Sequence, residues 1–275
     1  FLAISGIILP MLPHKNLIPD INLTPYSIWL ATVVVSGISY LSYLLKRYVF
    51  HESGVLVSGI IGGLYSSTAT ISVLARKSRK ASEQEANEYV AAMLLAVSMM
   101  FLRFMILILI FSREIFTSIY PYLLIMSVVA AVVAWFIHSR HRRSKDMTDE
   151  SEDEDSSNPL EFKVALIFAT LFVVFTVLTH YTLVYAGTGG LNLLSFVSGL
   201  SDITPFILNL LQNTGSVAVL VVVACSMQAI ISNILVNMFY ALFFAGKGSK
   251  LRPWILGGFG TVIGVNLVLL LFFYL

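Results

Sequence analysis

The stretch from Ser58 to Ala75, SGIIGGLYSSTATISVLA, is apolar at both ends and polar in its centre. Its flanks have the composition of a membrane-spanning helix, but Gly62 and Gly63 and four hydroxyl residues interrupt the middle. Glycine allows a helix to break or a backbone to approach closely, and hydroxyl oxygens can replace part of an ion's water shell. The stretch therefore predicts an interrupted membrane helix with an ion-binding role for the hydroxyl residues Ser66, Ser67, Thr68 and Thr70.

The composition of the chain is typical of a membrane protein with several spans. Of its 275 residues, 57% are hydrophobic and only 12% are charged, and the mean hydropathy is +0.87. These values lie far outside the range of a soluble domain. The charges gather in a few short connections, so we expect contact with the lipid bilayer and no nucleic-acid partner.

The sequence lacks the residues that several classes of function require. Cys225 is the single cysteine, so neither a disulfide framework nor a cysteine metal site can form. A phosphate-binding glycine loop is absent, which excludes an ATP-driven pump within this chain. Asp202 and His180 lack the partners that an intramembrane protease requires. We predict neither a cofactor nor an enzyme, and the identity of any bound metal stays open.

Eight apolar segments predict an all-α polytopic membrane protein. In hydrocarbon only helices and closed barrels satisfy their backbone hydrogen bonds, and these runs are too long and too uniformly apolar for barrel strands. The segments are Tyr26–Leu45, Val55–Ala75, Tyr89–Phe111, Ile119–Ile137, Phe162–Tyr185, Leu191–Leu211, Val217–Ala245 and Trp254–Leu275.

The segments form two internal repeats. Residues 139–160, a basic block followed by an acidic one, form a solvated linker between a first repeat at 21–138 and a second at 161–275. Each repeat has a second segment that is interrupted by glycine, serine or threonine. When Leu64 is aligned with Leu200, Ser66 stands opposite Asp202. A duplicated, interrupted segment is a pointer to the binding site of a transporter, here between the two repeats.

The positions of the basic residues bear on the topology. If all eight segments cross the membrane, the basic clusters fall on both sides. If the two interrupted segments are re-entrant, every basic cluster and the linker lie on the cytoplasmic side, and the repeats are inverted. We favour the second arrangement, although a full span with a glycine kink has the same sequence pattern. The clusters are at 46–47, 76–80, 140–145 and 247–252.

Asp202 is the only carboxylate within an interrupted apolar segment, in SGLSDITPF. A carboxylate at membrane depth must be paired, hydrated or protonated, so we predict that Asp202 binds an ion. The alternative is that Asp202 caps the start of a helix. Pro205 frees a backbone carbonyl that could face a cation, and Gly199 provides the helix break.

Arg103 lies deep inside its segment, in MMFLRFMIL, and needs a partner. We predict that it lies close to Asp202 as a gate or a counter-charge, and the alternative is that it reaches the lipid headgroups. Asn233 and Asn237 are four residues apart and share a helix face. They suit a polar lining of the site or a seam of hydrogen bonds between helices equally well.

Gly59 and Gly63 have a second interpretation, because they form a small-xxx-small pattern that is used for tight helix packing. Packing explains the glycines, but it does not explain the consecutive hydroxyl residues that follow them.

Five motifs resemble a known family: GGLYSSTATISVLARKSRK, FLRFMILILIF, NPLEF, SGLSDITPFILNL and ISNILVN. They look like the C-terminal membrane domain of unknown function in bacterial and archaeal MgtC/SapB family proteins, from about Asn22 onward. The resemblance implies an MgtC-like N-terminal membrane domain before Phe1, consistent with residues 1–20 being the tail of an upstream helix and a loop. The family usually has an acid at the position of Thr204 and often a lysine at that of Asn237. It implies an ion-related role only loosely.

Two functions follow from these observations. The first is a secondary transporter or exchanger of a small ion, with a divalent cation among the candidates, in a prokaryotic inner membrane. The second is a non-transporting membrane module that docks to a partner membrane protein through its small-residue surfaces. A homo-oligomer is compatible with either function.

Overall fold

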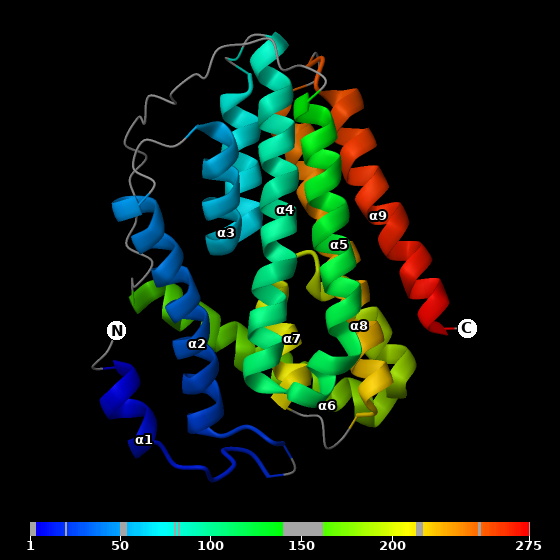
Figure 1. Cartoon of the computed structure of the whole chain (residues 1–275). Coiled ribbons are helices and arrows are strands. Elements are labelled where there is room, and N and C mark those ends of the chain that lie inside the picture. Colours follow the sequence, from blue (N-terminus) through cyan, green and yellow to red (C-terminus); the bar gives the residue numbers. More distant parts are fainter. Residues whose placement is uncertain are drawn as a thin grey trace. The chain divides into compact units, whose positions relative to one another are not determined.

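The computed structural model describes residues 4–19, 21–49, 54–79, 81, 83–139, 162–212, 217–246 and 249–274. This part of the chain is helical and contains no β-strand (Figure 1). Two π-helical turns, Ile4–Ile8 and Leu45–Val49, flank the first helices. The helices are α1 (Leu9–Met11), α2 (Pro25–Leu44), α3 (Val55–Lys77), α4 (Glu83–Phe111), α5 (Arg113–Ser139), α6 (Phe162–Ser198), α7 (Ile203–Gln212), α8 (Val219–Ala245) and α9 (Arg252–Tyr274).

Seven of the described helices are long and apolar enough to cross a membrane, and α7 is a shorter apolar helix. The prediction of an all-α polytopic membrane protein is confirmed, and the chain is an integral membrane protein. Four of the eight predicted segments lie wholly within one helix, namely Val55–Ala75, Tyr89–Phe111, Ile119–Ile137 and Phe162–Tyr185. Three others correspond to α2, α8 and α9 apart from one or two residues at an end. The remaining interrupted segment, Leu191–Leu211, is divided between the end of α6 and α7. The predicted linker 139–160 lies outside the described residues except for Ser139.

Helix α3 is broken at Ser66, whose dihedral angles φ −157° and ψ 107° are those of extended backbone. A Cβ atom added to Gly62 would lie 2.5 Å from Thr70 Oγ1. In a straight helix these two positions would be about 12 Å apart along the axis. The helix therefore folds back at Ser66 into two arms that lie side by side (Figure 1). Both ends of such a hairpin point the same way, which favours a re-entrant element over a kinked full span.

Helix α6 is kinked at Gly187, where φ is +58° and ψ is −153°. Side chains rarely adopt this backbone conformation, so glycine is required there. The predicted gap between the fifth and sixth segments lies at this kink, and helical hydrogen bonding resumes after it. Helix α6 ends at Ser198, and α7 begins at Ile203 and packs against α6. Its residues from Ile203 to Leu211 are all buried.

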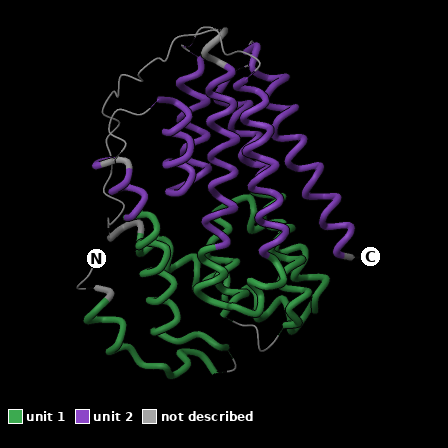
Figure 2. Tube along the Cα trace, viewed as in Figure 1, with its two compact units in different colours: residues 1–40, 106–119, 157–233 green, residues 41–105, 120–156, 234–275 purple. Residues whose placement is uncertain are grey.

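The chain forms two compact units (Figure 2). Unit 1 consists of residues 1–40, 106–119 and 157–233, and unit 2 of residues 41–105, 120–156 and 234–275. Each unit takes segments from both predicted repeats, so the units are not the same as the sequence repeats. The broken helix α3 and most of α4 belong to unit 2, whereas α6, α7 and the first half of α8 belong to unit 1.

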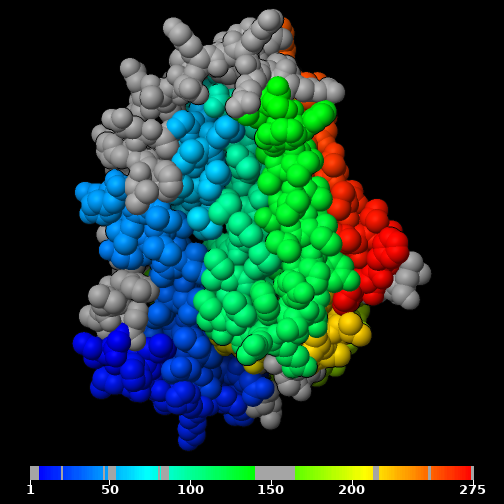
Figure 3. Space-filling model, in the orientation of Figure 1, coloured from blue at the N-terminus to red at the C-terminus, as the bar shows by residue number. Residues whose placement is uncertain are grey.

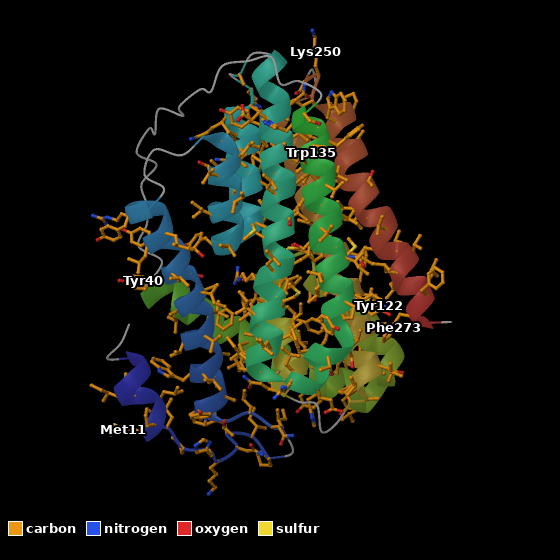
Figure 4. All side chains as sticks on the ribbon, in the orientation of Figure 1. Met11, Tyr40, Tyr122, Trp135, Lys250 and Phe273 are labelled. Atoms are coloured by element: carbon orange, nitrogen blue, oxygen red, sulfur yellow. The ribbon has the colours of Figure 1, made fainter. Side chains whose placement is uncertain are left out.

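The outer surface of unit 2 is apolar. Helix α5 runs along the visible face in Figure 3 and exposes apolar side chains on successive turns, among them Leu124, Val128, Val132 and Trp135. An exposed apolar stripe of this length is suited to contact with lipid. Helix α5 also contacts α9, where the rings of Tyr122 and Phe273 lie edge to face with centroids 5.7 Å apart (Figure 4).

Candidate functional site

The first break is the point in unit 2 where Ser66 separates the two arms of α3. The Ala69 backbone N–H donates to Ser66 Oγ, with 3.3 Å between the nitrogen and the oxygen. Serine is a preferred residue at a helix start because its side chain satisfies a backbone N–H that has no partner within the helix. Ser66 thus acts as the N-cap of the second arm. The break is at Ser66 and not at Gly62 or Gly63, both of which are helical.

Arg103 binds the other side of the first break. Its Nη1 atom donates to the Tyr65 carbonyl oxygen at 2.8 Å. This carbonyl is at the end of the first arm of α3, where helix carbonyls lack partners and the helix dipole favours a positive charge. The deep arginine therefore has a protein partner on the adjacent broken helix. Asp202 belongs to the other unit, and the proximity of Arg103 and Asp202 stays a prediction.

The glycines of the first break are packing positions. A Cβ atom on Gly63 would lie 2.5 Å from the Ala96 Cα atom, and one on Gly59 would lie 2.9 Å from that of Ala92. Real Cβ atoms do not come so close to a neighbouring backbone, so the first arm of α3 touches α4 because of these two glycines. Their small-xxx-small interpretation is supported.

The hydroxyl residues of the first break differ in their surroundings. Ser67 is buried, whereas Ser66, Thr68 and Thr70 are half-buried. Thr70 packs against Gly62 in the other arm, and the Thr68 carbonyl accepts a hydrogen bond from Ser72 Oγ. Hence Ser66 and Thr70 have structural roles in the hairpin, and an ion-binding role for the hydroxyl residues stays a prediction.

The second break, residues 199–202 in unit 1, separates α6 from α7. The Thr204 backbone N–H donates to Asp202 Oδ1 at 2.9 Å, so Asp202 is the N-cap of α7. The carboxylate is exposed in the described structure and Thr204 is buried. The helix cap, which is the alternative role predicted for Asp202, is therefore present. Because a capping carboxylate keeps free oxygen lone pairs, an ion-binding role is compatible with it.

The role predicted for Pro205, a freed backbone carbonyl that could face a cation, stays a prediction, and such a carbonyl would lie before α7. Helix α7 begins at Ile203, so Pro205 lies in its first turn. Backbone N–H groups in a first turn have no carbonyl partner within the helix, and proline there removes none of the helix hydrogen bonds. Pro205 therefore frees no carbonyl of α7 for a cation.

Helix α8 packs tightly on the second break. A Cβ atom on Gly199 would lie 2.6 Å from Ser232 Oγ and 2.7 Å from the Ala229 carbonyl oxygen. Ser232 Oγ donates to the Phe196 carbonyl at 2.7 Å. Asn233 Nδ2 lies 3.4 Å and 3.5 Å from the carbonyl oxygens of residues 199 and 201. Asn233 thus takes part in a seam between helices, the second of its two predicted roles, and Asn237 is fully buried in unit 2.

The two breaks correspond position by position. The same offset along the chain relates Gly63 to Gly199 and the contacting residue Ala96 to Ser232. It also relates the two N-caps, Ser66 and Asp202. Each unit therefore contains a helix break and a side chain that caps the helix after the break. In each unit the following helix, α4 or α8, also packs against a glycine just before the break. This agreement supports the predicted internal repeat.

The repeats differ in where they carry charge. In the first break the cap is a neutral serine and the partner of the preceding carbonyl is a guanidinium. In the second break the cap is a carboxylate and the partner of the preceding carbonyls is a neutral amide. Charge of opposite sign thus stands at the two corresponding breaks.

Two further buried polar contacts join helices, and their partners could not be predicted from the sequence. Ser98 and Ser127 join α4 to α5, with Oγ atoms 3.0 Å apart. Asn209 Nδ2 donates to Thr176 Oγ1 at 2.6 Å and joins α7 to α6. An isolated polar residue within an apolar run was the available signal in each case. No group of three or more metal-ligating His, Cys, Asp or Glu residues occurs among the described residues.

Comparisons with known proteins give a family without an assigned activity. Residues 33–245 match the family model "Domain of unknown function (DUF4010)". An uncharacterized protein of Aquifex aeolicus (strain VF5) is 27% identical over 221 residues, which cover 79% of this chain and 94% of that protein. No solved structure matches the chain. The family model covers well over half of the sequence, and the chain belongs to the DUF4010 family.

Proposed function

We propose that this protein is a secondary transporter or exchanger of a small ion, without enzymatic activity, and that its two breaks serve ion binding. The observation that carries the proposal is the repeated broken helix, with Ser66 and Asp202 as equivalent caps and Gly63 and Gly199 as equivalent packing positions. Broken helices in two repeats are a recurrent way to place backbone ends at membrane depth in transporters.

The ends of broken helices are suited to ions. A helix N-terminus carries a partial positive charge and a C-terminus a partial negative charge, and both are strongest where water is excluded. Asp202 adds a full negative charge at the second break, and Arg103 adds a full positive charge at the first. In the proposed mechanism Asp202 is the carboxylate that attracts and releases a cation. Arg103 and the hydroxyl residues near Ser66 keep the roles predicted for them, as a counter-charge and as ion ligands.

The resemblance to MgtC/SapB family proteins gives general support for an ion-related role and does not specify the ion. We propose accordingly that the chain is related to MgtC/SapB proteins and lies in a prokaryotic inner membrane with its basic clusters cytoplasmic. One feature of unit 2 is consistent with this orientation. Arg79 Nη2 donates to the Phe243 carbonyl at 3.3 Å, and the Arg76 guanidinium lies 4.3 Å from the centroid of the Phe244 ring. The basic end of α3 thus lies at the end of α8.

The decisive experiment removes the negative charge at position 202 and keeps a side chain that can cap α7. Asparagine caps a helix start as well as aspartate does, so Asp202→Asn removes the charge with little effect on α7. The purified chain and the variant are reconstituted in liposomes, and cation flux is measured with Glu114→Gln, an exposed carboxylate at the start of α5, as the control. We expect at least a tenfold loss of flux in Asp202→Asn alone, about 1.4 kcal/mol in transition-state terms. Wild-type flux in Asp202→Asn contradicts the mechanism.

A specific observation favours the second candidate, a docking module. Gly59 and Gly63 are already in contact with α4, but Gly257, Gly260 and Gly264 on α9 form a face on which a Cβ would meet no described atom within 4 Å. Close helix packing in membranes uses such faces. On this alternative, Gly260→Leu abolishes co-purification with a membrane partner, and Asp202→Asn has no effect.

A further inference from the structure

A buried polar cluster lies between α6 and α7 in unit 1 and consists of Thr176, Thr179 and Asn209. The exposed fractions of the three residues are 2%, 2% and 0%. Next to Thr176 in sequence, Phe175 joins the same two helices, because its ring and that of Phe206 lie 5.7 Å apart between centroids. Asn209 is seven residues after Asp202, about 10 Å along α7, so the cluster is separate from the second break.

Thr179 is the unusual member of the cluster. A threonine within a helix normally donates its hydroxyl to the carbonyl four residues earlier. Thr179 Oγ1 has no hydrogen-bond partner among the described residues. A buried hydroxyl without a partner is destabilising, and more so in a membrane. Four other threonines of the described helices make the normal bond, namely Thr32, Thr170, Thr176 and Thr261.

The geometry places Thr179 beside the other two members. Thr176 and Thr179 are three residues apart on the same buried face of α6, so their Cβ atoms are about 5–6 Å apart. Asn209 Nδ2 is bound to Thr176 Oγ1 at 2.6 Å. Thr179 is therefore one helical turn along α6 from the threonine that Asn209 contacts, and the three residues supply three side-chain oxygens from a short length of two helices.

The cluster is at the C-terminal end of α7. Asn209 belongs to the last turn of this helix, which ends at Gln212, and Leu210 and Leu211 are buried. The last four carbonyls of a helix have no partner within it and carry the negative end of the helix dipole. The Gln212 side chain donates in another direction, to the Ser27 carbonyl at 3.3 Å. A buried helix end of this kind attracts a positive charge.

We propose that the Thr176, Thr179 and Asn209 cluster binds a partly dehydrated Na⁺ ion. Hydroxyl, carboxamide and helix-end carbonyl oxygens are ligands for hard cations, and half-helix C-termini coordinate Na⁺ in transporters. The cluster contains no carboxylate, and carboxylates are the usual ligands of Ca²⁺ and Mg²⁺, so a monovalent ion fits it better. The inference rests on the proposed function only in giving the Na⁺ ion a coupling role.

The test measures binding without transport. The full chain is purified in detergent, and its Tm is recorded by tryptophan fluorescence in NaCl and in choline chloride at equal ionic strength. We expect NaCl to raise the Tm of the wild type by roughly 2–4 °C when Na⁺ is several times its Kd. The rise is lost in Thr179→Val, which keeps the shape of the side chain, and in Asn209→Leu. It persists in Thr170→Val, which removes an exposed, internally bonded hydroxyl from the same helix.

Two outcomes overturn the proposal: no difference between the two salts in the wild type, or a full Na⁺ shift in Thr179→Val. In the second case the variant loses the same Tm in both salts, which indicates a buried water in place of the ion. Asp202→Asn separates this inference from the proposed function, because we expect that variant to lose flux and to keep the Na⁺ shift.

Discussion

Arg103 on α4 donates from Nη1 to the Tyr65 carbonyl oxygen, 2.8 Å away, immediately before the break in α3. The bond joins a charged side chain to the carbonyl end of a helix, where hydrogen bonds within the helix stop. It gives a structural reason for an arginine deep in an apolar span. The arginine keeps the end of the first arm of α3 in place next to Ser66.

The Arg103 bond predicts a specific loss of stability. Arg103→Met keeps an unbranched apolar stem and removes the donor, and hydrogen bonds to charged groups contribute about 1.5–3 kcal/mol. We expect Arg103→Met to lower the free energy of unfolding by about that amount, measured by thermal or denaturant unfolding in detergent. Arg103→Lys should lose less, because an ammonium group can still donate to the Tyr65 carbonyl. Equal stability of Arg103→Met and wild type would falsify the structural role.

The Ser66 cap predicts that some replacements are tolerated. Ser66→Ala removes the acceptor for the Ala69 N–H and should destabilise the hairpin by about 1 kcal/mol. Ser66→Asn should be close to neutral, because asparagine is a good N-cap. Thermal unfolding of the three proteins under one condition provides the comparison. The prediction is wrong when Ser66→Ala and Ser66→Asn have the same Tm.

The contact between Gly63 and Ala96 predicts a steric effect. The Cβ atom of Gly63→Ala would meet the backbone of α4, which cannot move as a flexible side chain can. We expect a loss of roughly 1–3 kcal/mol, the usual effect of overpacking, and the same for Gly199→Ala at the equivalent position. Gly264→Ala is the control, since its Cβ meets no described atom within 4 Å and alanine favours the helix. A harmless Gly63→Ala contradicts the tight packing of α3 on α4.

The kink in α6 predicts a difference between neighbouring glycines. Gly187→Ala places a side chain at φ +58° and ψ −153° and should destabilise the protein by about 1–3 kcal/mol. Gly189→Ala has open space around it and no such angle, so it should be neutral or stabilising by up to about 1 kcal/mol. Unfolding of the two variants is compared directly. If they behave alike, the kink is not a fixed feature of α6.

The sequence by itself determined the class of fold and the approximate ends of most helices, because lipid permits only internally bonded helices along apolar runs of this length. It also located both interrupted segments, because the polar residues in SGIIGGLYSSTATISVLA and SGLSDITPF stand out from apolar flanks. The repeat could be inferred for the same reason, from the common order of these features.

Only the tertiary structure decided how the breaks are built. Sequence placed the first break near Gly62 and Gly63, but those glycines are helical and allow close contact with Thr70 and Ala96. The partner of Arg103 is a backbone carbonyl, and every residue has one, so no sequence pattern could identify Tyr65. Likewise, the missing bond of Thr179 depends on its buried surroundings on α6, not on residue type. Hydropathy is a local property of the chain, whereas a helix fold-back, a carbonyl partner and a buried hydroxyl depend on contacts between segments distant in sequence.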